Sequence, residues 1–323
     1  MTEAPAPSYR PPTVDEVERL LSSRRPTPGV APWARWVVIA GVGVVVLSLL
    51  LSMIDAGEAA ALLPVAAVLI AAIGLRLRAN RERAAHDAVN AAHELSALRR
   101  SREALAEAWR LWPSGAASPS RRRQLLAIMA QSLEEIGAWE QALRVLDELL
   151  ETLPAPSPPE LMLRLRRASV LVWTEQLTDV DDELRSARPR LGAERANLGW
   201  ALYRQAELLR DAATGHADRV EALGAPLIEE LRPLGVDAAV GYAAAAVCLA
   251  RLADADQKRQ DAPAPARPSA MLDPDRPAAE RLWAMARDWW RRACDLAPEA
   301  PLVARVPQGD RWLPGLASRE AAA

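Results

Sequence analysis

The stretch Arg123–Pro154 decides the fold of this chain: RQLLAIMAQSLEEIGAWEQALRVLDELLETLP. Its apolar residues recur every three or four positions on both sides of Gly137, which is the pattern of two amphipathic helices joined by a short turn. The small residues Ala130 and Ala142 allow two antiparallel helices to approach closely, while larger apolar residues fill the gap to a neighbouring pair. Pro154 then ends the unit.

The same stretch resembles a tetratricopeptide repeat, a helix–turn–helix unit of about 34 residues. A second unit displaced by about 38 residues follows, a third opens at Leu198 and a fourth near Val240. The resemblance covers about residues 120–300, with a loop at 257–277 and a C-terminal tail at 301–323, and it implies an all-α solenoid. The second-helix spacing of the first unit returns near the end of the chain: Ala142, Leu146, Leu149 and Pro154 correspond to Ala286, Trp290, Ala293 and Pro298.

Two apolar runs upstream predict a transmembrane hairpin over residues 33–78. Residues 37–54 carry no charge and reach about 27 Å as a helix, enough for a hydrocarbon core of about 30 Å. After a polar break at 55–58, residues 59–75 form a second uncharged run. A signal peptide fits the first run poorly because no A-x-A site follows it. A buried soluble hairpin is the remaining alternative.

Arginines flank this hairpin on one side only. Before the first run stand Arg10, Arg24, Arg25 and Arg35, and after the second come Arg76, Arg78, Arg81 and Arg83, whereas the connecting loop has none. The positive-inside rule therefore predicts a multi-pass protein of the cell (inner) membrane with both termini in the cytoplasm. The lipid bilayer is its first expected partner.

Two further segments flank the hairpin. Residues 1–32 are proline-rich and predicted to be disordered and cytoplasmic, apart from a short amphipathic helix at 13–23 that Thr13 and Glu16 cap as a capping box. That helix could dock on the membrane or on the distal domain. Residues 79–112 contain no proline or glycine and are predicted to form one helical stalk that continues from the second span.

The composition and motifs disfavour several function classes. Forty basic residues against 42 acidic ones give a net charge of −2, so we expect no nucleic-acid partner. We find no nucleophile elbow, P-loop, dinucleotide fingerprint or zinc-protease motif, and therefore expect no enzyme, cofactor or metal. A membrane-anchored scaffold or adaptor that binds an unknown cytoplasmic protein or peptide fits best. A membrane-anchored enzyme or a signalling or secretion component without a readable motif is the alternative.

The resemblance also implies where a partner would bind, because the inner groove of tetratricopeptide repeats is lined mainly by first helices. Trp173 and Trp200 have a second interpretation, in which they only fill the core between units. The groove positions implied by the resemblance are Gln124, Gln131, Glu134 and Glu135 in the first unit, Leu165, Ser169, Val172 and Trp173 in the second, and Trp200, Tyr203 and Arg204 in the third.

Overall fold

The computed structural model describes residues 10–23, 57–116, 118–192, 197–234, 238–261 and 276–297, together with 302–303, 305–306, 309 and 311–313. Over these residues the chain is helical and contains no strand, which confirms the all-α class. The first predicted span at 37–54 lies outside the described residues, as does most of the segment predicted to be disordered.

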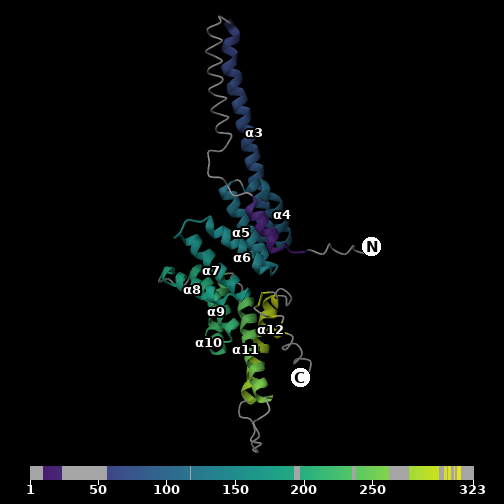
Figure 1. The fold of residues 1–323 in the computed structure, drawn as a ribbon, viewed down its shortest axis with the longest axis vertical. Helices are drawn as coiled ribbons and strands as arrows, with labels where there is room; N and C mark the ends of the chain where they lie inside the picture. Colours follow the sequence, from purple (N-terminus) through teal and green to yellow (C-terminus); the bar gives the residue numbers. More distant parts are fainter. Residues whose placement is uncertain are drawn as a thin grey trace, which may run out of the picture.

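The helices are arranged as a stack of antiparallel pairs with a long arm at one end (Figure 1). Two short 3-10 helices, η1 (Arg188–Arg190) and η2 (Arg232–Leu234), follow the third and fourth pairs. The α-helices are α1 (Val14–Ser22), α3 (Gly57–Ala97), α4 (Ser101–Gly115), α5 (Pro119–Glu135), α6 (Trp139–Glu151), α7 (Pro158–Trp173), α8 (Leu177–Ala187), α9 (Leu198–Thr214), α10 (Ala217–Leu231), α11 (Ala238–Asp261) and α12 (Arg276–Leu296).

The turn inside each of the first four pairs has the same backbone geometry. One residue adopts a positive φ in each turn: Arg99, Gly137, Glu175 and Gly215. Arg99, Gly137 and Glu175 are evenly spaced along the chain, whereas Gly215 lies two residues farther along than the same spacing would place it. The amide of the following residue donates to the carbonyl five positions earlier, at 2.9–3.0 Å in all four turns. This is the bond of the Schellman motif, which satisfies carbonyls left open at the end of a helix.

Buried side chains follow the same spacing. Counted from the turn, the same position on the first helix is buried in all four pairs. One position on the second helix, also counted from the turn, is buried in all four pairs as well. Because these positions are small or β-branched in most pairs, the helices of a pair can approach closely. The two sets are Ala92, Ala130, Ala168 and Leu208 on the first helices, and Ala104, Ala142, Val180 and Val220 on the second helices.

The predicted continuous stalk at 79–112 is therefore wrong. The helix α3 ends at Ala97, the chain reverses at Arg99, and α4 packs antiparallel against the end of α3. The stack accordingly begins with the α3–α4 pair, upstream of the predicted boundary at residue 120. The predicted loop at 257–277 also starts later than expected, because α11 continues to Asp261.

The first half of α3 contains the second predicted span, 59–75, and projects from the stack (Figure 1). Where side chains are described, from Ala72 onward, the first buried one is Val89. Ile73, Leu75 and Leu77 are 57%, 63% and 55% exposed. Three large apolar residues so close together, with no described element covering them, are unusual on a surface that faces only water.

Within the part of the chain described, one helix, α11, is long and apolar enough to span a membrane by length and composition alone, so the predicted two-helix hairpin is not confirmed. However, 72% of its most apolar window is buried, and α9, α10 and α12 pack around it. Its apolar side chains are thus accounted for by packing inside the protein, so α11 does not support the membrane prediction.

The predicted N-terminal helix is present as α1, and it docks on the stack. Thr13 and Glu16 form the capping box, with Thr13 N donating to Glu16 Oε2 at 2.7 Å. The apolar face of α1 buries Val17 and Leu21, mainly against α6. Its C-terminal carbonyls accept from Trp112 Nε1 at 2.9 Å and from Arg122 Nη2 at 3.4 Å.

The turn geometry predicts opposite effects for two substitutions. Gly137→Ala should lower the stability of the full chain by about 1 kcal/mol, because a Cβ is strained at a φ of 76°. Arg99→Gly should leave stability unchanged or raise it, because Arg99 already bears that strain at a φ of 58°. Thermal melts of the detergent-solubilised protein, followed by circular dichroism, would show this. Equal effects of the two changes would contradict the shared turn.

Candidate functional site

First helices of successive pairs line one groove of about 830 Å³, which we call the inner groove. Side chains from α3, α5, α7, α9 and α11 contribute to it, joined by Trp139 at the start of α6. Its lining includes Ser96, Arg99, Gln131, Glu134, Glu135, Trp139, Met162, Leu163, Arg166, Ser169, Trp173, Leu198, Leu202, Val240 and Arg305.

The structure brings together five of the eleven predicted groove residues. Gln131, Glu134 and Glu135 from α5 and Ser169 and Trp173 from α7 all line the inner groove. Trp139, Met162, Leu163 and Arg166 line it as well and were not predicted. Trp139 was missed because it belongs to a second helix, although its position two residues after Gly137 places it at the turn.

The other six predicted residues lie elsewhere. Leu165 and Val172 are buried in the core, and Gln124 is exposed on α5. The remaining three belong to α9. Trp200 Nε1 donates to the carbonyl of Gly192 at 2.9 Å, Tyr203 lies in another pocket, and Arg204 pairs with Glu230 on α10 at 2.5 Å. The residues predicted on α9 face away from the groove because the interval before the fourth turn is two residues longer than the others, and two extra residues rotate a helix face by about 200°. On α9 the groove face instead carries Leu198, Leu202 and Gln205.

Aromatic stacking forms one wall of the inner groove. The rings of Trp139 and Trp173 stack with centroids 3.9 Å apart and an interplanar angle of 27°. Two buried polar atoms of the groove lining, Trp173 Nε1 and Ser96 Oγ, have no hydrogen-bond partner among the described residues. A buried polar group without a partner costs about 1–3 kcal/mol, so both are unusual in a wall that serves packing alone.

The two carboxylates of the groove are held differently. Glu134 pairs with Arg166 of α7 at 2.8 Å, and burial raises the pKa of Glu134 while Arg166 opposes that shift. Glu135 instead accepts hydrogen bonds from the neutral donors Ser101 Oγ and Gln131 Nε2, the latter at 3.2 Å. Glu134 is thus neutralised inside the protein, whereas Glu135 is only hydrogen-bonded.

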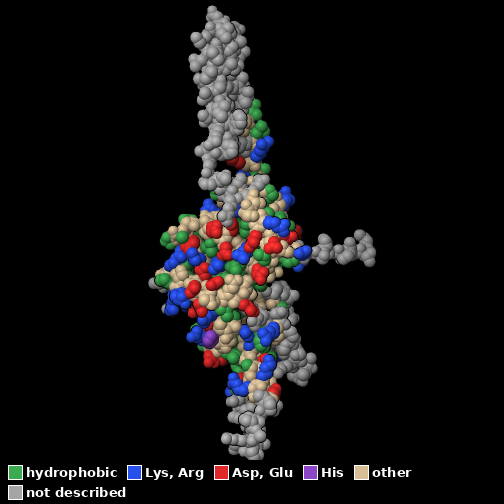
Figure 2. Space-filling model, in the orientation of Figure 1, with side chains coloured by type: hydrophobic (Ala, Val, Ile, Leu, Met, Phe, Trp, Pro, Cys, Tyr) green, Lys and Arg blue, Asp and Glu red, His purple; other side chains and the backbone are tan. Residues whose placement is uncertain are grey.

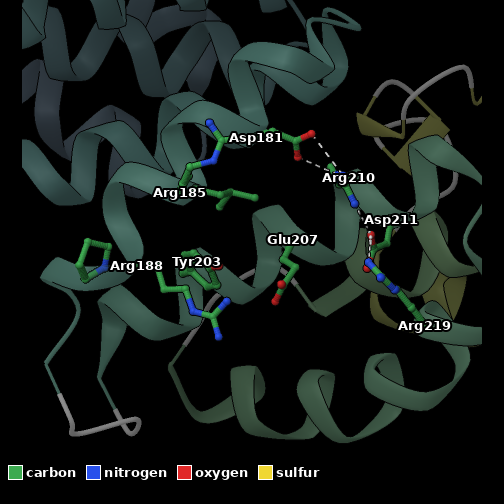
Figure 3. A pocket seen from close by; sticks show the side chains of 10 residues that line it. Asp181, Arg185, Arg188, Tyr203, Glu207, Arg210, Asp211 and Arg219 are labelled. Carbon is green, nitrogen blue, oxygen red and sulfur yellow. Dashed lines mark hydrogen bonds and ion pairs between the residues drawn. The ribbon is translucent and has the colours of Figure 1, made fainter.

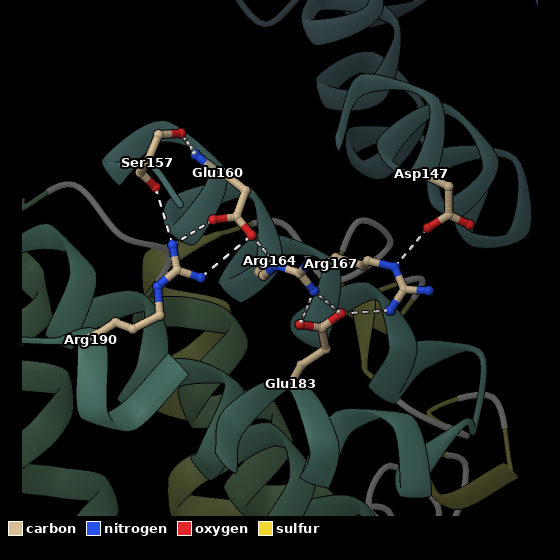
Figure 4. Close-up of polar contacts among 7 residues, drawn as sticks. All are labelled: Asp147, Ser157, Glu160, Arg164, Arg167, Glu183 and Arg190. Atoms are coloured by element: carbon tan, nitrogen blue, oxygen red, sulfur yellow. Dashed lines mark hydrogen bonds and ion pairs between the residues drawn. The ribbon is translucent and has the colours of Figure 1, made fainter. Parts of the chain in front are cut away.

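A buried ion network on the opposite face of α7 fixes the position of this helix (Figure 4). Glu160 accepts from Arg164 and from Arg190 of η1, and Ser157 caps the start of the helix. Further along α7, Arg164 and Arg167 share Glu183 of α8, and Arg167 reaches Asp147 of α6 at 2.7 Å. The network therefore joins α6, α7, α8 and η1.

A second pocket, of about 530 Å³, lies between α8, α9 and α10 (Figure 3). Its charges largely pair with each other: Arg210 bridges Asp181 and Asp211, each at 3.0 Å, and Arg219 lies 3.7 Å from Asp211. Burial raises the pKa of Glu207, and the neighbouring Asp211 adds to that shift. These pairs connect α9 to α8 through Asp181 and to α10 through Arg219.

On the face of the stack seen in Figure 2, basic and acidic side chains are interspersed, and no large field of one sign covers it. Within the described residues, no group of three or more His, Cys, Asp or Glu could hold a metal ion. The architecture is a stack of helical hairpins with a groove along its first helices. No family model, no curated protein and no solved structure matches this chain.

The network on α7 predicts a dependence of stability on pH. Ion pairing to Arg190 and Arg164 lowers the pKa of Glu160 from 4.5 to about 2. Because the pKa is lower in the folded protein, Glu160 stabilises the fold above pH 4.5, and this contribution is lost as the pH falls from 4.5 toward 2.

Glu160→Gln should therefore lower stability at pH 7 by about 2 kcal/mol, since both arginines partly reach solvent. The difference between wild type and variant should shrink as the pH falls below 4.5, measured by urea unfolding of the detergent-solubilised chain. Glu140→Gln, at an exposed position, serves as the control. A difference that stays constant with pH would contradict this assignment.

Proposed function

We propose that this chain is a membrane-anchored scaffold whose tetratricopeptide-like helix pairs bind a segment of a cytoplasmic protein in the inner groove. The observation that carries the proposal is the groove itself, to which five successive first helices contribute side chains. A groove built across several units offers an extended surface to one partner segment, which is how helical repeat proteins bind. Aromatic and arginine side chains in its lining are the residue types that dominate binding hot spots.

The likeness to tetratricopeptide repeats in this proposal concerns architecture. The units are longer than the roughly 34 residues of that family, as the positions of the left-handed turns at Arg99, Gly137, Glu175 and Gly215 show. The longer interval leaves room for about one more helical turn per unit. A small buried residue on each helix of a pair and a left-handed turn between them support the likeness.

The transmembrane hairpin over 33–78 belongs to the same proposal. Its second span lies in α3, a helix of 41 residues that projects from the stack and exposes Ile73, Leu75 and Leu77 at the end of the predicted span. A lipid environment would cover such residues. Arginines follow immediately along α3, at Arg76 and Arg81, where a cytoplasmic membrane surface places them.

The docking of α1 supports an even number of membrane crossings. This helix precedes the first predicted span, whereas α4–α6 follow the second. Hydrogen bonds join the two parts: Trp112 Nε1 to the Leu20 carbonyl, and Gln141 Nε2 to the Pro12 carbonyl at 3.0 Å. Parts that touch lie on the same side of a membrane, so a chain that enters the bilayer between them must also return.

We expect the protein to stay with the membrane fraction after high-salt and carbonate washing, because two apolar spans are embedded. Reporter domains fused to either terminus should both report the cytoplasm. Release into the soluble fraction would contradict the hairpin, and a periplasmic signal from one terminus would contradict the topology.

Photo-crosslinking in cells tests the groove. A crosslinking amino acid in place of Leu163, which lies half-buried in the inner groove, should give a discrete product with another protein. The same amino acid in place of Glu140, exposed on α6, should not. Trp173→Ala should remove the product from the Leu163 position while the chain stays helical. Equal products from both positions would contradict binding in the groove.

A further inference from the structure

The inner groove contains two carboxylates, and one of them forms no ion pair with a described residue. Glu135, the last residue of α5, receives hydrogen bonds from Ser101 and Gln131 but forms no ion pair with a described arginine or lysine. Its neighbour Glu134 is paired with Arg166. The lining also includes Arg99, whose side chain is exposed.

Aromatic rings line the same groove as this carboxylate. Trp173 ends α7 as Glu135 ends α5 one unit earlier, so the two occupy equivalent positions on first helices of neighbouring pairs. Trp139 stacks on Trp173 and starts the helix that leaves the turn after Glu135. An indole face beside a carboxylate is complementary to a cation, which the ring attracts electrostatically.

A buried acceptor completes the set. Ser96 is 2% exposed, lines the same groove, and its Oγ has no hydrogen-bond partner among the described residues. A hydroxyl oxygen can accept from a donor that a ligand brings. A guanidinium carries five donors in a planar fork and stacks on indole, so it suits a carboxylate, a hydroxyl and an aromatic wall together better than an ammonium does.

We propose that the end of the inner groove formed by Ser96, Glu135, Trp139 and Trp173 binds an arginine side chain of the partner segment. The partner is then a peptide in which arginine is flanked by apolar residues, which contact Met162, Leu163 and Leu202 farther along the groove. This inference rests on the proposed function and specifies the partner chemistry. Arg99 and Arg305 carry positive charge in the same lining and oppose the incoming arginine electrostatically, whereas Arg166 is paired with Glu134.

The test uses the full chain in lipid nanodiscs and a phage-displayed library of random dodecapeptides. Arginine should be enriched among the selected peptides. The strongest binder, labelled with fluorescein, should bind about tenfold more weakly when its arginine is replaced by citrulline, a neutral residue of the same shape. Glu135→Gln should weaken the arginine peptide by a similar factor, and the citrulline replacement should then have no further effect.

Two control variants test whether the charge at Glu135 determines the affinity for the peptide. Glu140→Gln removes the same charge from an exposed position and should leave binding unchanged. Arg99→Gly removes one of the opposing cations and should strengthen binding. Two results would overturn the arginine site: selected peptides that lack arginine, or a citrulline replacement that weakens binding to Glu135→Gln as much as it weakens binding to the wild type. In either case the proposed groove function would still stand if Leu163→Gln weakens binding of the selected peptides. Selection of no peptide at all would overturn both proposals.

Discussion

The hydrogen bond that closes the first helix in each of the first four pairs sets the spacing of the stack. It runs from the residue after the left-handed position to the carbonyl five residues earlier, and it recurs in four turns. Because this bond fixes where the second helix starts, it also fixes which side chains of the two helices meet. Ala130 and Ala142 face each other's helices only because the turn at Gly137 has this geometry. The groove along the first helices is a consequence of that regular spacing.

Ion pairs to buried carboxylates fix the orientation of α7, which packing of apolar side chains alone would define less strictly. The carboxylates of Glu160 and Glu183 are buried and shared between arginines of α7 and η1. A buried ion pair adds little net stability relative to apolar residues, but its geometry admits few alternatives. Here it holds α7 in one rotation, so that Met162, Arg166 and Trp173 face the inner groove while Glu160 and Arg164 face η1 and α8.

Where the sequence carries a strong signal, the prediction agrees with the structure. The helix capped by Thr13, the turn at Gly137 and the displacement between the first two units were all readable from capping chemistry, glycine and apolar spacing. The turn at Arg99 was not, because arginine gives no sign of a left-handed conformation and no proline or glycine interrupts the helical pattern. The groove residues of α9 were missed for a related reason, since two extra residues rotate its face and only the assembled turn reveals them.

The continuity of α3 has a mechanical consequence. The helix is uninterrupted from Gly57 to Ala97, so the predicted membrane segment and Ser96, which lines the inner groove, belong to one rigid rod. From Leu75 to Ser96 this rod is about 32 Å long. In the proposed membrane-anchored scaffold, a tilt of about 10° in the bilayer, within the range that transmembrane helices show, would carry the groove sideways by about 6 Å. The orientation of this one helix in lipid would then determine where, and at what angle, the groove meets the proposed partner.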